Sequence, residues 1–151
     1  MNNLANLRPI RLLLVEDSPA DARLTRESLK DCKVMVDMQH VKDGVDAMQY
    51  LRREGKFADA QRPDLVILDL NMPKKDGRET LEEIKSDPDL RRIPVVILTI
   101  SESEEDILRT YNLHANAFIT KPIDLEQFSR VVREIENFWF TIVKLPNGLG
   151  M

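Results

Sequence analysis

Short runs of apolar, mostly branched residues alternate with helix-length segments along the chain, and this alternation is the strongest constraint on its fold. The runs cover residues 10–15, 65–68, 95–98 and 117–119. Continuous apolarity over so few residues is typical of strands buried on both faces of a parallel sheet. Residues 34–41 alternate more between apolar and polar side chains, which predicts an edge strand with one wetter face.

The segments between these strands begin with residues typical of a helix start. Ser18 and Pro19 supply a cap and a first helical residue, and Asp43 precedes a second helical segment. A capping box, which is an oxygen acceptor with Glu or Gln three positions later, is predicted at Asp76, Ser101 and Asp124. Successive strand–helix units imply a parallel sheet with helices on both faces, and right-handed crossovers then favour a doubly wound topology.

The composition agrees with a single soluble domain. The chain has 151 residues, of which 42% are hydrophobic and 32% charged. No apolar run is long enough to span a membrane, and the first residues lack a secretory signal pattern. Cys32 is the single cysteine, which favours a reducing, cytoplasmic location, and the net charge of −4 gives no support for a nucleic-acid partner. We therefore expect a cytoplasmic protein without a membrane or nucleic-acid partner and with little chain left for an appended effector.

Polar residues stand directly at the ends of the buried runs. Glu16 and Asp17 follow the first strand, Asp69 and Thr99 end two others, and Lys121 follows the last. In an open parallel sheet, ligands bind outside the carboxyl ends of the strands, at the point where the strand order reverses. We therefore expect three carboxylates, a hydroxyl and an ammonium to converge at this edge.

Three carboxylates in one crevice repel one another unless a cation neutralises them. Mg²⁺ prefers oxygen ligands and typically combines one or two carboxylates with water and phosphate. Lys121 adds a positive charge, and a carboxylate can itself be the nucleophile that forms an aspartyl phosphate. Phosphoryl transfer needs positioning and charge neutralisation more than acid–base chemistry, so the expected site suits a phosphoryl group.

Four spaced motifs resemble the receiver domain of two-component response regulators. They are residues 13–18 (LLVEDS), 64–77 (DLVILDLNMPKKDG), 94–99 (PVVILT) and 118–122 (FITKP). Residues 86–94 and the aromatic tail are similar to single-domain regulators that partner cyanobacterial phytochrome kinases. The resemblance implies a flavodoxin-like, five-stranded parallel sheet in the order 2-1-3-4-5, with five helices.

The resemblance also implies a role for each acid of the expected site. Asp69 would accept a phosphoryl group from the phosphohistidine of a sensor histidine kinase of phytochrome type. Asp17 and Asp69 would bind Mg²⁺, with Glu16 acting through water and Asn71 contributing its backbone carbonyl. The chain would then be a phosphorylation-activated switch that changes its protein-binding surface, not an enzyme acting on other substrates.

Three further residues would carry the response to phosphorylation. Lys121 would pair with the phosphoryl oxygens, and its bond to Pro122 is expected to be cis. Thr99 would donate a hydrogen bond to a phosphoryl oxygen, and Phe118 would be the aromatic that rotates inward. The family often has Tyr at the position of Phe118, so a partner that reads its hydroxyl is not expected here.

Other functions and plainer roles stand beside this hypothesis. An aspartyl-phosphate phosphatase commonly has a general acid two residues after the nucleophile, where Asn71 cannot protonate a leaving group. The turn at residues 16–19 lacks the glycines that let a dinucleotide pyrophosphate approach. Taken singly, Lys121 would be a surface lysine, Thr99 a strand residue and Phe118 a core aromatic.

The C-terminal segment continues an apolar stripe beyond the usual end of a receiver's last helix. Its first part is expected to pack on the sheet. A dense apolar cluster beyond it is typical of an interface, and we expect a homodimer through Phe138, Trp139, Phe140 and Ile142. The predicted division of the chain is an N-terminal arm at 1–8, the receiver domain at 9–143 and a tail at 144–151.

Overall fold

Five parallel strands form one sheet in the order β2-β1-β3-β4-β5, which confirms the doubly wound, flavodoxin-like fold. The computed structural model describes residues 9–32, 35–70, 75–99 and 117–139, and it describes only the backbone of residue 99 and residues 134–139. The strands are β1 (Ile10–Val15), β2 (Val36–Val41), β3 (Leu65–Asp69), β4 (Val95–Thr99) and β5 (Ala117–Thr120). The described helices are α1 (Pro19–Ser28), α2 (Gly44–Arg52), α3 (Gly77–Ser86) and α5 (Leu125–Trp139). The helix and capping box expected at Ser101 lie outside the described residues.

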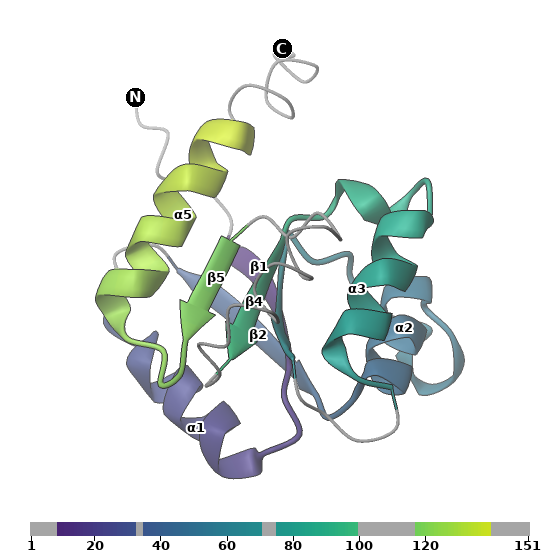
Figure 1. Cartoon of the computed structure of the whole chain (residues 1–151), viewed down its shortest axis with the longest axis horizontal. Coiled ribbons are helices and arrows are strands. Elements are labelled where there is room, and N and C mark those ends of the chain that lie inside the picture. The colour runs from purple at the N-terminus through teal and green to yellow at the C-terminus, as the bar shows by residue number, and fades with distance from the viewer. Residues whose placement is uncertain (1–8, 33–34, 71–74, 100–116, 140–151) are drawn as a thin grey trace.

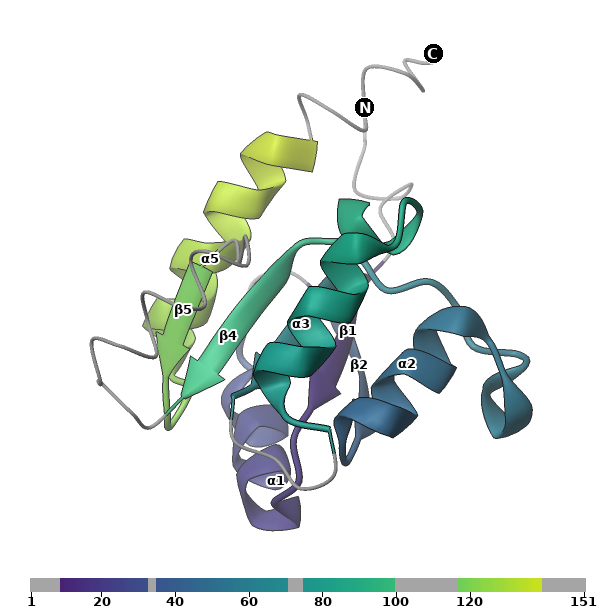
Figure 2. The same cartoon turned by 45° about the vertical axis from the view of Figure 1, so that its right-hand side comes forward.

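Two helical layers cover the two faces of the sheet (Figures 1 and 2), with α1 and α5 on one side and α2 and α3 on the other. Each face has its own core cluster, and neighbouring residues of β1 alternate between them. Leu12 and Leu14 pack with Phe128 of α5, whereas Leu13 and Val15 pack with Leu81 of α3. Burial on both faces explains why the central strands are apolar at nearly every position.

The edge position predicted for residues 34–41 is confirmed for β2. This strand pairs with β1 alone. Its buried residues are Met38 and Val41, and its other four residues are half-buried or exposed. Among the described residues, no helix combines the length and the apolarity that a membrane span requires.

Three of the predicted helix caps form as expected. The side chains of Ser18 and Asp43 accept hydrogen bonds from backbone N–H groups of α1 and α2, and Asp76 forms a complete, reciprocal capping box with Glu79. The box predicted at Asp124 is half wrong. Its carboxylate accepts the N–H of Gln127, but the Gln127 amide bonds the backbone of Thr120 instead of returning to the cap.

The start of α3 packs unusually close to the end of β3. A Cβ atom at Gly77 would lie 2.3 Å from the carbonyl oxygen of Asp69 and 2.7 Å from the Cα of Leu70. The Gly77 N–H donates to the carbonyl of Leu70 across the same turn. Only glycine permits this approach, so Gly77 sets how α3 supports the strand end that carries Asp69.

Candidate functional site

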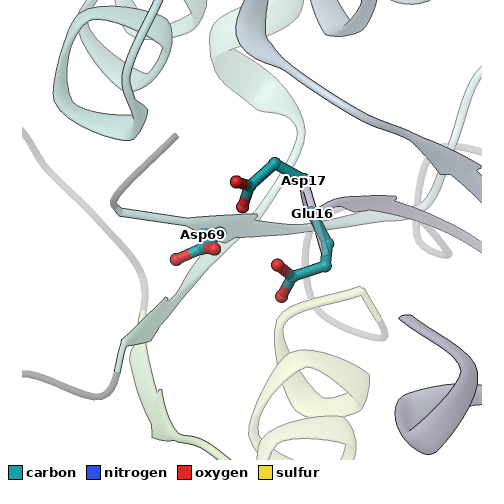
Figure 3. Close-up of side chains that lie close together, drawn as sticks. All are labelled: Glu16, Asp17 and Asp69. Carbon is teal, nitrogen blue, oxygen red and sulfur yellow. The ribbon is translucent and has the colours of Figure 1, made fainter. Parts of the chain in front are cut away.

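The expected convergence of acids occurs at the carboxyl edge of the sheet. Glu16 and Asp17 follow β1 directly, Asp69 is the last residue of β3, and the pairing of Val15 with Leu68 brings these ends together. One carboxylate oxygen from each of the three acids lies within 4.8 Å of the others. Figure 3 shows the three side chains gathered at this strand end. The sheet topology therefore builds an oxygen-only cluster from the adjacent acids Glu16 and Asp17 and from Asp69, which lies 52 positions after Asp17.

Glu16 is the most tightly held of the three acids. Its side chain is 0% exposed, and its Oε2 accepts the Ser18 N–H at 3.1 Å. Its backbone is tied to the edge strand, because Glu16 N donates to the carbonyl of Val41 and His40 Nε2 donates to the carbonyl of Glu16 at 2.7 Å. Asp17, by contrast, is exposed, and Asp69 is buried. The cluster thus has a closed inner side and an open outer side.

Lys121 follows β5 and reaches across to the acids. Its Nζ lies 2.8 Å from Glu16 Oε1, 3.1 Å from Asp69 Oδ2 and 3.1 Å from Asp21 Oδ2. The peptide bond between Lys121 and Pro122 is cis. One ammonium therefore serves three carboxylates at once.

The pKa values of Glu16 and Lys121 are both raised, which favours the neutral form of Glu16 and the charged form of Lys121. Burial raises the pKa of Glu16 to about 7, and the charge of Asp69 adds to the rise, while the contacts with Lys121 and the Ser18 N–H oppose it. Burial by itself would lower the pKa of Lys121, but its hydrogen bonds to Glu16 and Asp69 outweigh burial and raise that pKa above its ordinary value. Lys121 is therefore a fixed cation, whereas ionised Glu16 is poorly compensated.

The donor set and the charge balance fit a hard divalent cation. The site offers only carboxylate oxygens, which are the ligands that Mg²⁺ and Mn²⁺ prefer. Counting Asp21, four carboxylates lie at the site, and three of them contact the ammonium of Lys121. The residues present would therefore gain from a bound divalent ion.

The remaining predicted residues are placed only in part. Thr99 is the last residue of β4 and pairs with Thr120, but its side chain is not described. Phe118 lies on β5, half-buried, and packs against the cluster that faces α2 and α3. Asn71 lies outside the described residues. The structure thus brings Glu16, Asp17, Asp69 and Lys121 together and leaves the switch residues as predictions.

The residues predicted for the dimer interface lie at the end of the described chain or beyond it. Phe138 and Trp139 are the last two residues of α5, with side chains that are not described, and Phe140 and Ile142 lie outside the described residues. The helix itself continues to Trp139, which agrees with the extended stripe read from the sequence.

Two contributors to the site were missed from the sequence. Asp21 is not among the residues predicted for the site, yet it contacts Lys121, which is 100 positions away. His40 is not among the residues predicted for the site either, yet its ring nitrogen donates a hydrogen bond to the backbone carbonyl of Glu16. An acid in the first helical turn after the Glu16–Asp17 pair was the available signal for Asp21; nothing in the sequence points to the contact of His40.

Residues 12–133 match the response regulator receiver domain family. The chain belongs to this family. Response regulator Rcp1 of Synechocystis is 48% identical over 138 residues, which cover 91% of this chain and 94% of Rcp1. The general function of receiver domains is a phosphorylation-activated switch.

Solved structures of receiver proteins agree with the fold and the site chemistry. The phosphorylated cyanobacterial phytochrome response regulator RcpA is 51% identical, with a TM-score of 0.74 over 91% of this chain and 98% of RcpA. The Mn²⁺-bound form of Rcp1 is 47% identical, with a TM-score of 0.72 over 90% of this chain and 98% of Rcp1. The chain is therefore a receiver close to phytochrome-associated regulators, in a family that binds divalent metal.

Proposed function

We propose that this receiver accepts a phosphoryl group on Asp69 from the phosphohistidine of a sensor histidine kinase, in a reaction that requires Mg²⁺. The observation that carries the proposal is the placement of the Lys121 ammonium 3.1 Å from Asp69 Oδ2, beside the oxygens of Glu16 and Asp17. A phosphoryl group on Asp69 would enter a place already arranged for negative charge.

The chemistry follows from the positions of these groups. A carboxylate oxygen of Asp69 attacks phosphorus, the bond from phosphorus to the histidine nitrogen breaks, and its electron pair stays on the imidazole, which takes up a proton. Lys121 Nζ moves from Asp69 Oδ2 to a phosphoryl oxygen. Asp17 and Asp69 would hold Mg²⁺ directly, Glu16 through water and Asn71 through its backbone carbonyl. A divalent ion bound there would neutralise charge on the phosphoryl oxygens.

The response would pass from the phosphoryl group to the surface near β4 and β5. Thr99 ends β4 and would turn its hydroxyl to the phosphoryl group, and Phe118 on the neighbouring β5 would rotate inward. Phe118 is half-buried between the core and the surface, which suits a side chain with two packings. Phosphorylation adds roughly −1.5 to −2 charges, enough to bias such an equilibrium.

The partners we propose are a phytochrome-type histidine kinase and a second copy of this chain. The kinase type is supported by the likeness to a phytochrome response regulator. A cytoplasmic location is supported by Cys32, which is a free cysteine. The homodimer would form through α5 and residues 138–142 of the receiver unit 9–143. Sedimentation at tens of micromolar, about the concentration where modest interfaces form, should show a dimer. A purely monomeric chain would contradict this assembly.

Labelling with a small phosphodonor tests the proposed chemistry. In Mg²⁺ the wild-type chain should gain one acid-labile phosphoryl group, and Asp69→Asn should gain none. Asp59→Asn, an equal change at an exposed acid outside the site, should label normally. Label that persists in Asp69→Asn would remove Asp69 from its role. A phosphotransfer profile against histidine kinases of the source organism would identify the donor.

A further inference from the structure

Asp21 is a carboxylate at the site that the receiver chemistry described above does not use. It stands in the first turn of α1, where its backbone N–H donates to Ser18 Oγ at 3.1 Å and fixes its position. Its Oδ2 lies 3.1 Å from Lys121 Nζ. Its side chain is 42% exposed, whereas those of Glu16 and Asp69 are 0% and 5% exposed.

The contact places the exposed carboxylate of Asp21 next to the buried pair of Glu16 and Asp69, on the same ammonium. Glu16, Asp21, Lys121 and Pro122 line a hollow of about 210 Å³, to which Asp17 and Asp69 do not contribute. An ammonium has three donors, and here each of three carboxylates accepts one contact from it. A phosphoryl oxygen that binds the ammonium of Lys121 must therefore compete with the carboxylate of Asp21 for it.

Two effects of Asp21 act in the same direction. Its negative charge attracts a cation to the acidic cluster and repels an anionic phosphodonor. Its hold on Lys121 also draws positive charge away from Glu16 and Asp69, which leaves their oxygens freer for a metal ion and the ammonium less free for a phosphoryl oxygen. Both effects favour the cation and oppose the anion.

We propose that Asp21 is a positioning residue that holds the ammonium of Lys121 beside Glu16 and Asp69 and so balances divalent-cation affinity against reaction with anionic phosphoryl donors. The inference rests on the proposed function, because it assigns Lys121 to the incoming phosphoryl group. It adds a charge-balancing role for a residue outside the metal ligands, the phosphoacceptor and the switch pair.

Asp21→Asn tests the balance, because it removes the charge and keeps the shape. The first measurement is the affinity for Mn²⁺ by calorimetric titration, which needs no phosphorylation. The second is the rate of labelling by acetyl phosphate below saturation, at a cation concentration that saturates both proteins. Glu27→Gln is the matched control, since it removes one charge from the same helix at a side chain that is 57% exposed and pairs with Lys30.

Opposite shifts are the expected signature. Asp21→Asn should bind Mn²⁺ about two- to fivefold more weakly and label about two- to fivefold faster, the size typical of one partly exposed charge. Both shifts should shrink in high salt, Asp21→Glu should restore the wild-type balance, and Glu27→Gln should leave both measurements unchanged.

Other outcomes decide against the proposal. Unchanged Mn²⁺ affinity would overturn it, and so would weaker cation binding together with slower labelling, because general damage to the fold lowers both. If the wild-type chain is not labelled at all, the proposed function fails, and the Mn²⁺ titration alone still decides whether Asp21 controls the charge of the site. If Asp69→Asn abolishes labelling while Asp21→Asn changes nothing, only the role of Asp21 falls.

Discussion

Replacing Glu16 by Gln should stabilise the metal-free protein above neutral pH. Glu16 has a side chain that is 0% exposed and a pKa raised from 4.5 to about 7, chiefly by burial. Gln keeps the shape and carries no charge to bury, and its single amide oxygen can accept from Lys121 Nζ or from the Ser18 N–H, but not from both. The variant therefore avoids the loss of folding stability that the wild type suffers once the unfolded chain ionises at Glu16, because burial of this charge in the fold is unfavourable.

The size and pH window follow from the raised pKa. A rise from 4.5 to about 7 corresponds to about 3 kcal/mol, at about 1.4 kcal/mol per pKa unit. Below pH 4.5 the folded and unfolded chains both hold the proton, so Glu16 has no effect on stability. As pH rises from 4.5 to 7 the unfolded chain releases the proton first, so wild-type stability falls, and above about 7 the loss is complete.

Urea unfolding in EDTA between pH 4.5 and 8 measures this difference. With an m value of about 2 kcal/mol/M, the midpoint of Glu16→Gln should exceed that of the wild type by about 1.5 M at pH 8. The gap should close toward pH 4.5. Glu27→Gln, an exposed control, should show no such pH-dependent gap.

Divalent cation should narrow the gap between the variant and the wild type at pH 8. At a Mg²⁺ concentration of about 100 times the dissociation constant, binding stabilises the wild type by about 2.7 kcal/mol, which nearly offsets the cost of the buried charge. The variant should gain less, because it has lost one acid of the cluster. A gap that is the same at every pH, or a variant less stable than the wild type at pH 8 in EDTA, would refute the reasoning.

Four further changes test the packing and the site. Gly77→Ala should destabilise the fold and slow labelling, since its Cβ would lie 2.3 Å from the backbone of Asp69; unchanged urea midpoints would contradict this contact. Phe128→Ala should cost about 3–5 kcal/mol in urea unfolding because this side chain is fully buried. Asp76→Ala should cost about 1 kcal/mol by the same assay, through loss of the capping box. Lys121→Ala should still bind Mn²⁺ by titration and should lose the change in proteolysis pattern on phosphorylation; a retained change would reassign the relay.

The succession of strands and helices could be predicted because its signals are local, whereas the strand order 2-1-3-4-5 was implied only by the resemblance to receiver domains. Branched apolar runs, caps at Ser18, Asp43 and Asp76, and the alternation of strands and helices each depend on a few neighbouring residues. Parallel pairing then carries the strand ends to one edge, so the meeting of Glu16, Asp17 and Asp69 follows from topology alone.

Finer contacts could not be predicted, because they depend on distances between surfaces that the chain pattern does not encode. The capping box predicted at Asp124 does not form, because the Gln127 amide forms hydrogen bonds with the backbone of Thr120, which lies seven residues earlier on β5. The close approach at Gly77 likewise appears only when α3 packs against the end of β3.

The sequence by itself determined the sheet, its layers and the acids at its carboxyl edge, because strand periodicity and helix capping are short-range effects that repeat along the chain. Only the tertiary structure decided how those groups share charge. The complete burial of Glu16 and the contact of Lys121 with Asp21, 100 residues apart, arise from packing between separate elements. Charge in a site depends on such distances and on exclusion of water, and both exist only once the elements have come together.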